Sequence, residues 1–133
     1  MDNKSNFYKK SQMFNKPSNL LRGFFNMKLN EELKGKKAID FGCGVGNDTK
    51  FLIENGFFVT CVDKNSKSKE LVCKKLQSSN KYEFLNEEFK DVNLPEVDLF
   101  YSCLSLHFIK PIDLENVMKK INESIKKYGF FVR

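Results

Sequence analysis

Three glycines at alternating positions, Gly42, Gly44 and Gly46, constrain the fold of this chain more than any other feature. They follow the short apolar run 37–41 and precede the helix-like stretch 47–55, so they mark a turn from a strand into a helix. Glycine has no Cβ, which lets the backbone turn tightly and lets a ligand approach it closely. In an open α/β sheet such a turn is where a ligand binds. A plain connection seldom needs three glycines, so the segment predicts a binding site.

Apolar runs and helical stretches alternate along the rest of the chain. Runs rich in β-formers predict strands, and apolar residues at helical spacing predict helices. Alternation with short connections favours a parallel sheet covered by helices on both faces. We therefore expect an α/β, Rossmann-like, doubly wound parallel sheet of about five strands. The predicted strands are 37–41, 57–62, 82–85, 97–102 and 130–132, and the predicted helices are 47–55, 66–78 and 112–128, with a polar loop at 86–96.

The chain before the first strand divides into two parts. Residues 1–16 are polar and charged, and we expect a flexible segment there, which leaves 17–133 as one domain. Ser18 follows Pro17 and can cap a helix that continues toward Gly35. The apolar residues of this predicted helix recur at helical spacing and are Leu20, Leu21, Phe24, Phe25 and Leu29.

The spacing of the glycines narrows the class of ligand. Dinucleotide-binding turns follow the pattern G-x-G-x-x-G, but Asn47 stands where the third glycine would be. A Walker-type loop is also absent, because no Gly-Lys-Ser/Thr follows the turn. The observed spacing is G-x-G-x-G, with Asp40 two residues before the first glycine. This arrangement suits a ligand with a ribose and a charged amino-acid tail but no phosphate.

A second acid, Asp63, ends the predicted second strand. A carboxylate at the tip of that strand can accept hydrogen bonds from both ribose hydroxyls, and its distance from the glycine turn is close to the roughly 20 residues expected in such folds. An Asp that ends a strand is more often the N-cap of the next helix. Together with the glycine turn, however, it supports a nucleoside-binding site.

At these positions the chain resembles class I S-adenosylmethionine-dependent methyltransferases. Residues 39–47 look like motif I of that family, and Asp63 matches its acid after the second strand. Looser similarities follow in the family's order at 85–89, at 97–102 (motif IV), at 104–108 and at 129–132. The resemblance covers about residues 37–132, and small-molecule methyltransferases of the tellurite-resistance type are the subgroup it suggests. It implies S-adenosyl-L-methionine as cofactor.

The resemblance also implies roles for individual residues. The glycines would line the methionine and ribose side of the cofactor, Asp40 would lie near its amino group, and Asp63 would bind the ribose. Glu88, or Glu87 in its place, and Phe89 would flank the adenine, and Ser102 or Leu104 would lie near the sulfonium. The implied cofactor-binding residues are Asp40, Gly42, Cys43, Gly44, Gly46, Asp63, Glu88, Phe89, Ser102 and Leu104.

Methyl transfer from a sulfonium needs alignment of donor and acceptor more than a protein nucleophile. No catalytic residue is therefore assigned from the sequence. His107 follows the predicted fourth strand and could act as a general base. A single histidine beside Phe108 and Ile109 is more often a packed structural residue.

The composition bears on the acceptor and on location. The net charge is +6, but the excess is spread as lysine pairs, and only Arg22 and Arg133 are arginines. Nucleic-acid readers favour Arg, so the composition counts against a nucleic-acid acceptor, and the resemblance implies a small-molecule acceptor instead. The four cysteines show no C-x-x-C pair, so we expect no metal. No segment resembles a signal peptide or a membrane span, and we expect a cytoplasmic protein.

The chain departs from the family at its end. Class I methyltransferases continue after the fifth strand with a helix and an antiparallel strand pair, whereas this sequence stops at Arg133. We expect a domain that is short at its C-terminus and lacks that pair, with 130–132 at a sheet edge open to self-association. Three hypotheses stay open: a small-molecule methyltransferase, an inactive cofactor-binding remnant, and a module that binds nucleotides or acts on nucleic acid.

Overall fold

The computed structural model of the protein describes residues 16–27 and 35–133. Except for Lys16, the segment 1–16 that was predicted to be flexible lies outside the described residues, and so does Leu29. The helices are α2 (Asn19–Met27), α3 (Asn47–Glu54), α4 (Ser66–Lys75) and α5 (Pro111–Ser124), with a short 3₁₀ helix, η2 (Leu106–Phe108). The strands are β1 (Lys37–Phe41), β2 (Phe58–Val62), β3 (Tyr82–Leu85), β4 (Val97–Tyr101) and β5 (Ile125–Val132).

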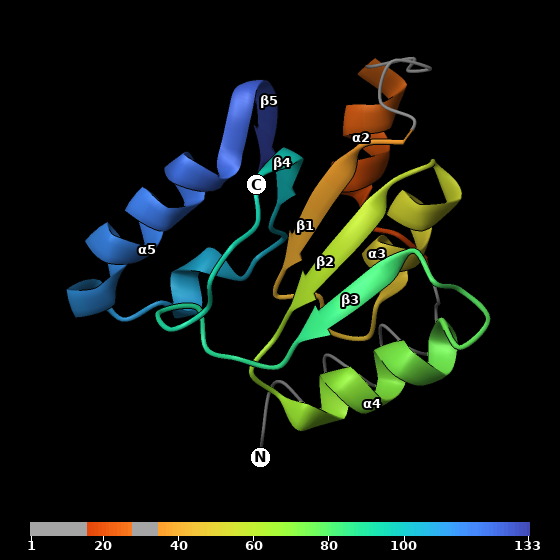
Figure 1. The fold of residues 1–133 in the computed structure, drawn as a ribbon, viewed down its shortest axis with the longest axis horizontal. Coiled ribbons are helices and arrows are strands. Elements are labelled where there is room, and N and C mark those ends of the chain that lie inside the picture. The colour runs from red at the N-terminus through yellow and green to blue at the C-terminus, as the bar shows by residue number, and fades with distance from the viewer. Residues whose placement is uncertain (1–15, 28–34) are drawn as a thin grey trace.

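The five strands form one parallel sheet in the order β3-β2-β1-β4-β5 (Figure 1). The chain runs outward from β1 to β2 and β3, and then returns to place β4 on the other side of β1. In such a sheet, ligands bind outside the carboxyl ends of the strands where the order reverses. The fold predicted from the sequence is confirmed, and the reversal places the binding crevice above β1 and β4.

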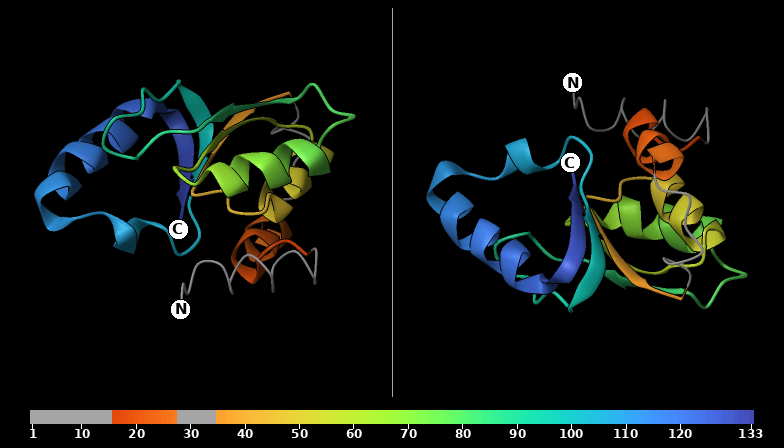
Figure 2. Two further views of the ribbon diagram at one scale, coloured as in Figure 1. Left: turned by 90° about the horizontal axis from the view of Figure 1, so that it is seen from below. Right: turned by 90° about the horizontal axis from the view of Figure 1, so that it is seen from above.

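Helices cover both faces of the sheet (Figure 2). Because side chains alternate along a strand, Ala38 of β1 packs on the face that α2, α3 and α4 cover, and Ile39 packs on the face that α5 covers. Each face has its own apolar cluster, centred on Leu52 and Val72 on one side and on Val117 and Ile121 on the other. None of the helices in the described ranges is long and apolar enough to cross a membrane.

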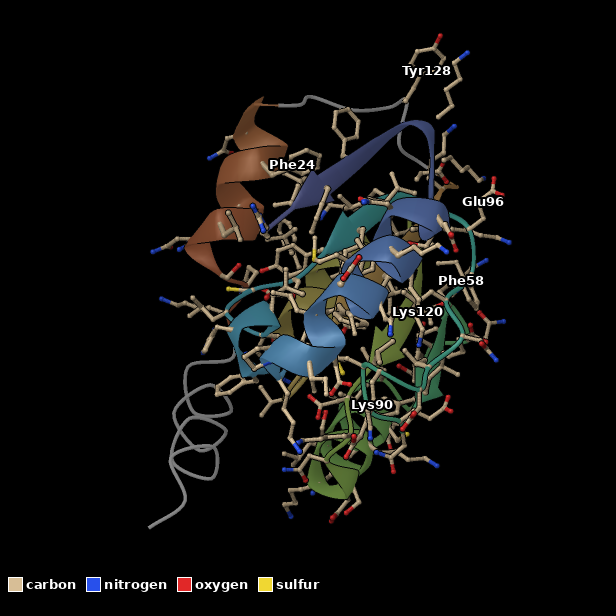
Figure 3. The ribbon with its side chains drawn as sticks, turned by 90° about the vertical axis from the view of Figure 1, so that its left-hand side faces the viewer. Phe24, Phe58, Lys90, Glu96, Lys120 and Tyr128 are labelled. Atoms are coloured by element: carbon tan, nitrogen blue, oxygen red, sulfur yellow. The ribbon has the colours of Figure 1, made fainter. Side chains whose placement is uncertain are left out.

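The end of the last helix differs from the prediction. We expected a helix through residue 128, but α5 ends at Ser124 and β5 begins at Ile125. Ile125 fits the apolar stripe of the helix, yet it pairs with Val97 of β4, and the register then shifts before the next pair. The intervening residues bulge outward, with Tyr128 exposed at a φ of 68° (Figure 3). A helix cannot pass through that left-handed residue, so pairing with β4 overrides the helical pattern.

Candidate functional site

A cleft of about 700 Å³ lies at the carboxyl ends of the strands. It is lined by residues 42–45 after β1, 63–64 after β2, 88–90 after β3 and 103–105 after β4. This volume lies within the roughly 300–1,000 Å³ of small-molecule sites. The structure brings seven predicted site residues to its wall: Gly42, Cys43, Gly44, Asp63, Glu88, Phe89 and Leu104.

The glycine turn adopts the backbone conformation that its composition predicted. The φ angles of Gly42, Gly44 and Gly46 are 83°, 55° and 86°, all in the left-handed region that other residues rarely adopt. A Cβ atom at position 42 would lie 2.5 Å from Cβ of Ser105, and one at position 46 would lie 2.9 Å from Cγ2 of Val72. The turn therefore packs against segments on both sides, and positions 42 and 46 have no room for a side chain.

Asp63 holds the glycine turn in place. Its Oδ2 atom accepts the backbone N–H of Gly44 at 3.1 Å, and its Oδ1 atom accepts the N–H of Asn65 at 2.9 Å. The N-cap of α4 is Asn65, whose side chain accepts the N–H of Lys67, so the alternative of Asp63 as a helix cap is wrong. The Asp63 side chain is buried at the cleft wall, where charge-assisted hydrogen bonds fix its carboxylate.

Asp40 lies beneath the turn and does not line the cleft. Its Oδ2 atom accepts a hydrogen bond of 2.7 Å from the hydroxyl of Thr49 on α3. Burial, together with the nearby charges of Asp48 and Asp63, raises the pKa of Asp40 to about 8, although the Thr49 hydrogen bond opposes the shift. The side chain therefore favours the neutral form at low and neutral pH.

Two other predicted residues also lie behind the cleft wall. Ser102 is buried, and its hydroxyl donates to the carbonyl oxygen of Phe41 at 3.0 Å, which ties the end of β4 to the end of β1. Gly46 is the residue that precedes α3, and it too lies outside the lining. Both support the shape of the site from behind.

The sequence did not predict a cluster of hydrogen-bonded side chains that lies at the cleft. Asp48, in the first turn of α3, accepts the backbone N–H of Ser18 at 2.6 Å and the hydroxyl of Tyr101 at 2.7 Å. The hydroxyls of Ser18 and Tyr101 are 2.5 Å apart. Burial raises the pKa of Asp48, although these hydrogen bonds lower it in part. An acid in the first turn of the helix after a glycine turn was the available signal.

The loop that carries Glu88 and Phe89 is held by contacts with β1 and α5. The ring of Phe89 stacks on that of Phe41 at a centroid distance of 3.8 Å. Lys120 of α5 donates hydrogen bonds to the carbonyl oxygens of Lys90 at 2.6 Å and of Val92 at 3.1 Å. Lys90 and Lys120 are labelled in Figure 3. A half-buried ammonium group thus holds the loop against α5.

The cleft wall that follows β4 carries large exposed side chains, unlike the glycine turn. Leu104 has a φ of 57° and is 71% exposed, and Phe108 is 59% exposed. The ring of His107 lies 4.1 Å from that of Phe108, and both residues line the cleft. His107 is exposed on the cleft wall, where its ring packs on that of Phe108 and not in the core.

Comparisons with known proteins agree with this geometry. A family model described as a methyltransferase domain matches residues 39–133. The ribosomal RNA small subunit methyltransferase A of Mesomycoplasma hyopneumoniae is 38% identical over 60 residues, which cover 45% of this chain and 23% of the relative. The carboxy-S-adenosyl-L-methionine synthase of Sulfurimonas denitrificans is 27% identical over 130 residues, or 95% of this chain and 52% of the relative.

The fold is shared with solved structures. An S-adenosylmethionine-dependent methyltransferase from Clostridium acetobutylicum superposes with a TM-score of 0.75 at 23% identity, over 96% of this chain and 54% of that one. The chain therefore spans about half the length, or less, of the proteins it matches.

Proposed function

Because the chain belongs to the methyltransferase domain family, we propose that its cleft binds S-adenosylmethionine and presents the methyl group to a small-molecule acceptor. One observation carries the proposal, namely the 3.1 Å bond that joins the Gly44 amide to the Asp63 carboxylate at the cleft wall. This bond places a fixed negative charge beside backbone that has no side chains. A ribose with two hydroxyls is suited to that combination.

The residues present fit such a cofactor. The cofactor carries a sulfonium and an ammonium group, and three carboxyl groups surround the glycine turn, at Asp40, Asp48 and Asp63. Asp48 lies on the cleft wall while Asp40 lies beneath the turn, so we assign the ammonium group to Asp48. Glu88 and Phe89 remain the proposed adenine neighbours, and Leu104 the residue nearest the sulfonium. Gly42 and Cys43 line the same half of the cleft.

When bound, S-adenosylmethionine supplies a sulfonium methyl group whose carbon–sulfur bond breaks with both electrons left on sulfur, as the acceptor's nucleophile bonds to the carbon. The residues of the chain align the two molecules and exclude water from the cleft. His107 lies on the wall after β4, where a ring nitrogen could take the proton that the acceptor loses.

Replacing Asp63 with Ala tests the proposal. We expect the dissociation constant of S-adenosylhomocysteine to rise at least about tenfold, as a lost charge-assisted hydrogen bond of about 1.5–3 kcal/mol implies. The measurement is calorimetric titration. Asn65→Ala is the matched control, because it removes the α4 cap and about 1 kcal/mol of stability but leaves the Asp63–Gly44 bond in place. Wild-type protein that binds NAD and not S-adenosylhomocysteine would contradict the proposal.

Lys120→Met should weaken adenosine binding although residue 120 lies outside the cleft lining. The change removes both hydrogen bonds to the 90–92 loop, so binding must then order Glu88 and Phe89 as well. We expect an affinity loss of about tenfold by calorimetry. Lys119→Met, at an exposed position on the same helix, is the control. Equal affinity for both variants would remove Lys120 from the positioning of this loop.

A nucleic-acid acceptor is the second candidate, because of the similarity to a ribosomal RNA methyltransferase over 60 residues. The exposed apolar side chains after β4 favour a small molecule instead, in line with the small-molecule subgroup that the resemblance of residues 37–132 suggests. Incubation with labelled S-adenosylmethionine separates the two, since label enters either a small-molecule extract or ribosomal RNA. Binding of the cofactor without transfer to either would identify an inactive cofactor-binding protein.

We also propose self-association through β5. This strand lies at an edge of the sheet, and an unpaired edge can accept another strand. Sedimentation that depends on protein concentration would support the pairing, and a constant monomer mass would contradict it.

A further inference from the structure

We propose that the part of the cleft that follows β4 is a subsite for an acceptor with an apolar body and a carboxylate group. The inference rests on the proposed function and names the substrate class for the same cleft. This part includes Leu104, His107, Phe108 and Lys110 after β4, and Lys16, which precedes α2, lines the same cleft; we call these five residues the acceptor wall.

The acceptor wall shares one residue with the proposed cofactor site, namely Leu104, which is proposed to lie nearest the sulfonium. The glycine turn follows β1, Asp63 follows β2, and Glu88 follows β3, whereas the segment from Leu104 to Lys110 follows β4. In the sheet, β4 lies on the opposite side of β1 from β2 and β3. A cofactor held by residues after β1, β2 and β3, with only its sulfonium near Leu104, leaves the rest of the acceptor wall for a second molecule.

Two exposed side chains of the acceptor wall indicate that the ligand has an apolar body. Leu104 and Phe108 are large, mostly exposed, and both line the cleft. Leu104 also occupies the left-handed region of backbone conformation, which is unfavourable for a residue with a Cβ. Strained backbone of this kind is found where a ligand site requires it. The strain here presents an apolar side chain to the cleft, where an apolar ligand would cover it.

The lysines of the acceptor wall indicate that the ligand carries a negative charge. Among the ion pairs of residues 16–27 and 35–133, none involves Lys16 or Lys110. Of the acids that line the cleft, Glu88 pairs with Lys90, at 3.9 Å. Asp113, in the first turn of α5, also lines the cleft, and the N-terminal end of a helix favours its negative charge.

The two remaining acids of the cleft lie on the cofactor side, where hydrogen bonds hold their carboxylates. Asp48 and Asp63 accept hydrogen bonds from backbone and hydroxyl donors on the cofactor side. On the side of the acceptor wall, Lys16 and Lys110 stand against the single acid Asp113, so the net charge there is positive. A carboxylate complements it, and an amine does not.

The single histidine of the chain provides a direct readout. Because His107 is the only imidazole, its ring NMR signals report on the acceptor wall without further assignment. Benzoate, benzyl alcohol and benzylamine are titrated at constant pH into the full chain. We expect benzoate to shift the His107 signals in a saturable way, with an affinity at least about tenfold higher than that of benzylamine.

Two variants separate charge from apolar contact. Lys110→Gln should weaken benzoate binding about fivefold or more and leave benzyl alcohol unaffected. Leu104→Gly relieves the backbone conformation, so the chain should stay folded, and it should weaken both ligands through the lost apolar contact. Lys74→Gln, an exposed change on α4, is the matched control and should leave every titration unchanged.

Calorimetry with adenosine on the same samples keeps the two proposals apart. Adenosine that binds while benzoate leaves His107 unmoved, or while benzylamine moves it equally, overturns the acceptor class and leaves the cofactor site standing. Benzoate that binds while adenosine and S-adenosylhomocysteine do not overturns the proposed function and, with it, the acceptor role of this wall.

Discussion

Gly42→Ala should destabilise the protein by about 2–5 kcal/mol, since the left-handed backbone costs an alanine about 1–2 kcal/mol and overpacking costs about 1–3 kcal/mol. The Cβ atom added at position 42 would lie 2.5 Å from the Cβ atom of Ser105. Ser105 follows β4, so the clash would push the cleft wall away from the glycine turn and should also abolish measurable cofactor binding. Urea unfolding gives the stability, and calorimetry gives the affinity.

Two further variants identify the cause of the expected loss. Gly23→Ala places the same atom on α2, where nothing lies within 4 Å, and should stabilise the protein by about 0.5–1 kcal/mol. Combining Gly42→Ala with Ser105→Gly removes the clash but not the unfavourable φ. The double variant should therefore recover part of the stability. A Gly42→Ala protein as stable as the wild type would show that the turn tolerates a side chain.

The stability of the protein should fall as pH rises from about 4 to about 8, by up to about 1.4 kcal/mol per pH unit from Asp40 alone. The pKa of Asp40 is raised from 3.8 to about 8. Within this window the folded protein holds a proton on Asp40 that the unfolded chain releases. The stabilisation is therefore complete below the lower pKa and is lost as pH passes the higher one. Urea unfolding at several pH values measures the slope.

Asp40→Asn isolates that contribution. The amide is neutral at every pH and can still accept the Thr49 hydroxyl, so the variant should become more stable than the wild type as pH rises. Asp91→Asn, in an exposed loop, should follow the wild-type slope. Parallel pH profiles for wild type and Asp40→Asn would mean that Asp40 is ionised in the folded state.

The fold could be predicted because its signals are local. Each strand is a short apolar run, and the glycine turn specifies its own backbone by lacking side chains. Asp63 could be predicted from spacing alone, since the turn and the tip of β2 meet at one end of a parallel sheet. Asp40 was expected near the amino group of the cofactor, but alternation along β1 places it on the same face as Ala38, where it binds Thr49 of α3 behind the cleft.

Other parts of the site depend on contacts between distant segments. Ser18 and Tyr101 are 83 residues apart in the chain, and no local pattern relates them to Asp48. Lys120 reads as an ordinary charge on the polar face of a helix until the 90–92 loop packs against it. Ile125 fits both a helical stripe and a strand, and its pairing with Val97 decides between them. Tertiary contact, rather than propensity, sets these features.

The bonds from Ser18 to Asp48 and Tyr101 connect the start of α2 to the rim of the cleft. A short helix at the periphery of a domain ordinarily frays and exchanges its amide hydrogens quickly. Here the Ser18 amide is bound to the carboxylate of Asp48, so its deuterium uptake should be slow and should slow further when a ligand orders that carboxylate. Deuterium uptake at Ser18, which itself lines the cleft, would therefore report whether a ligand occupies the cleft.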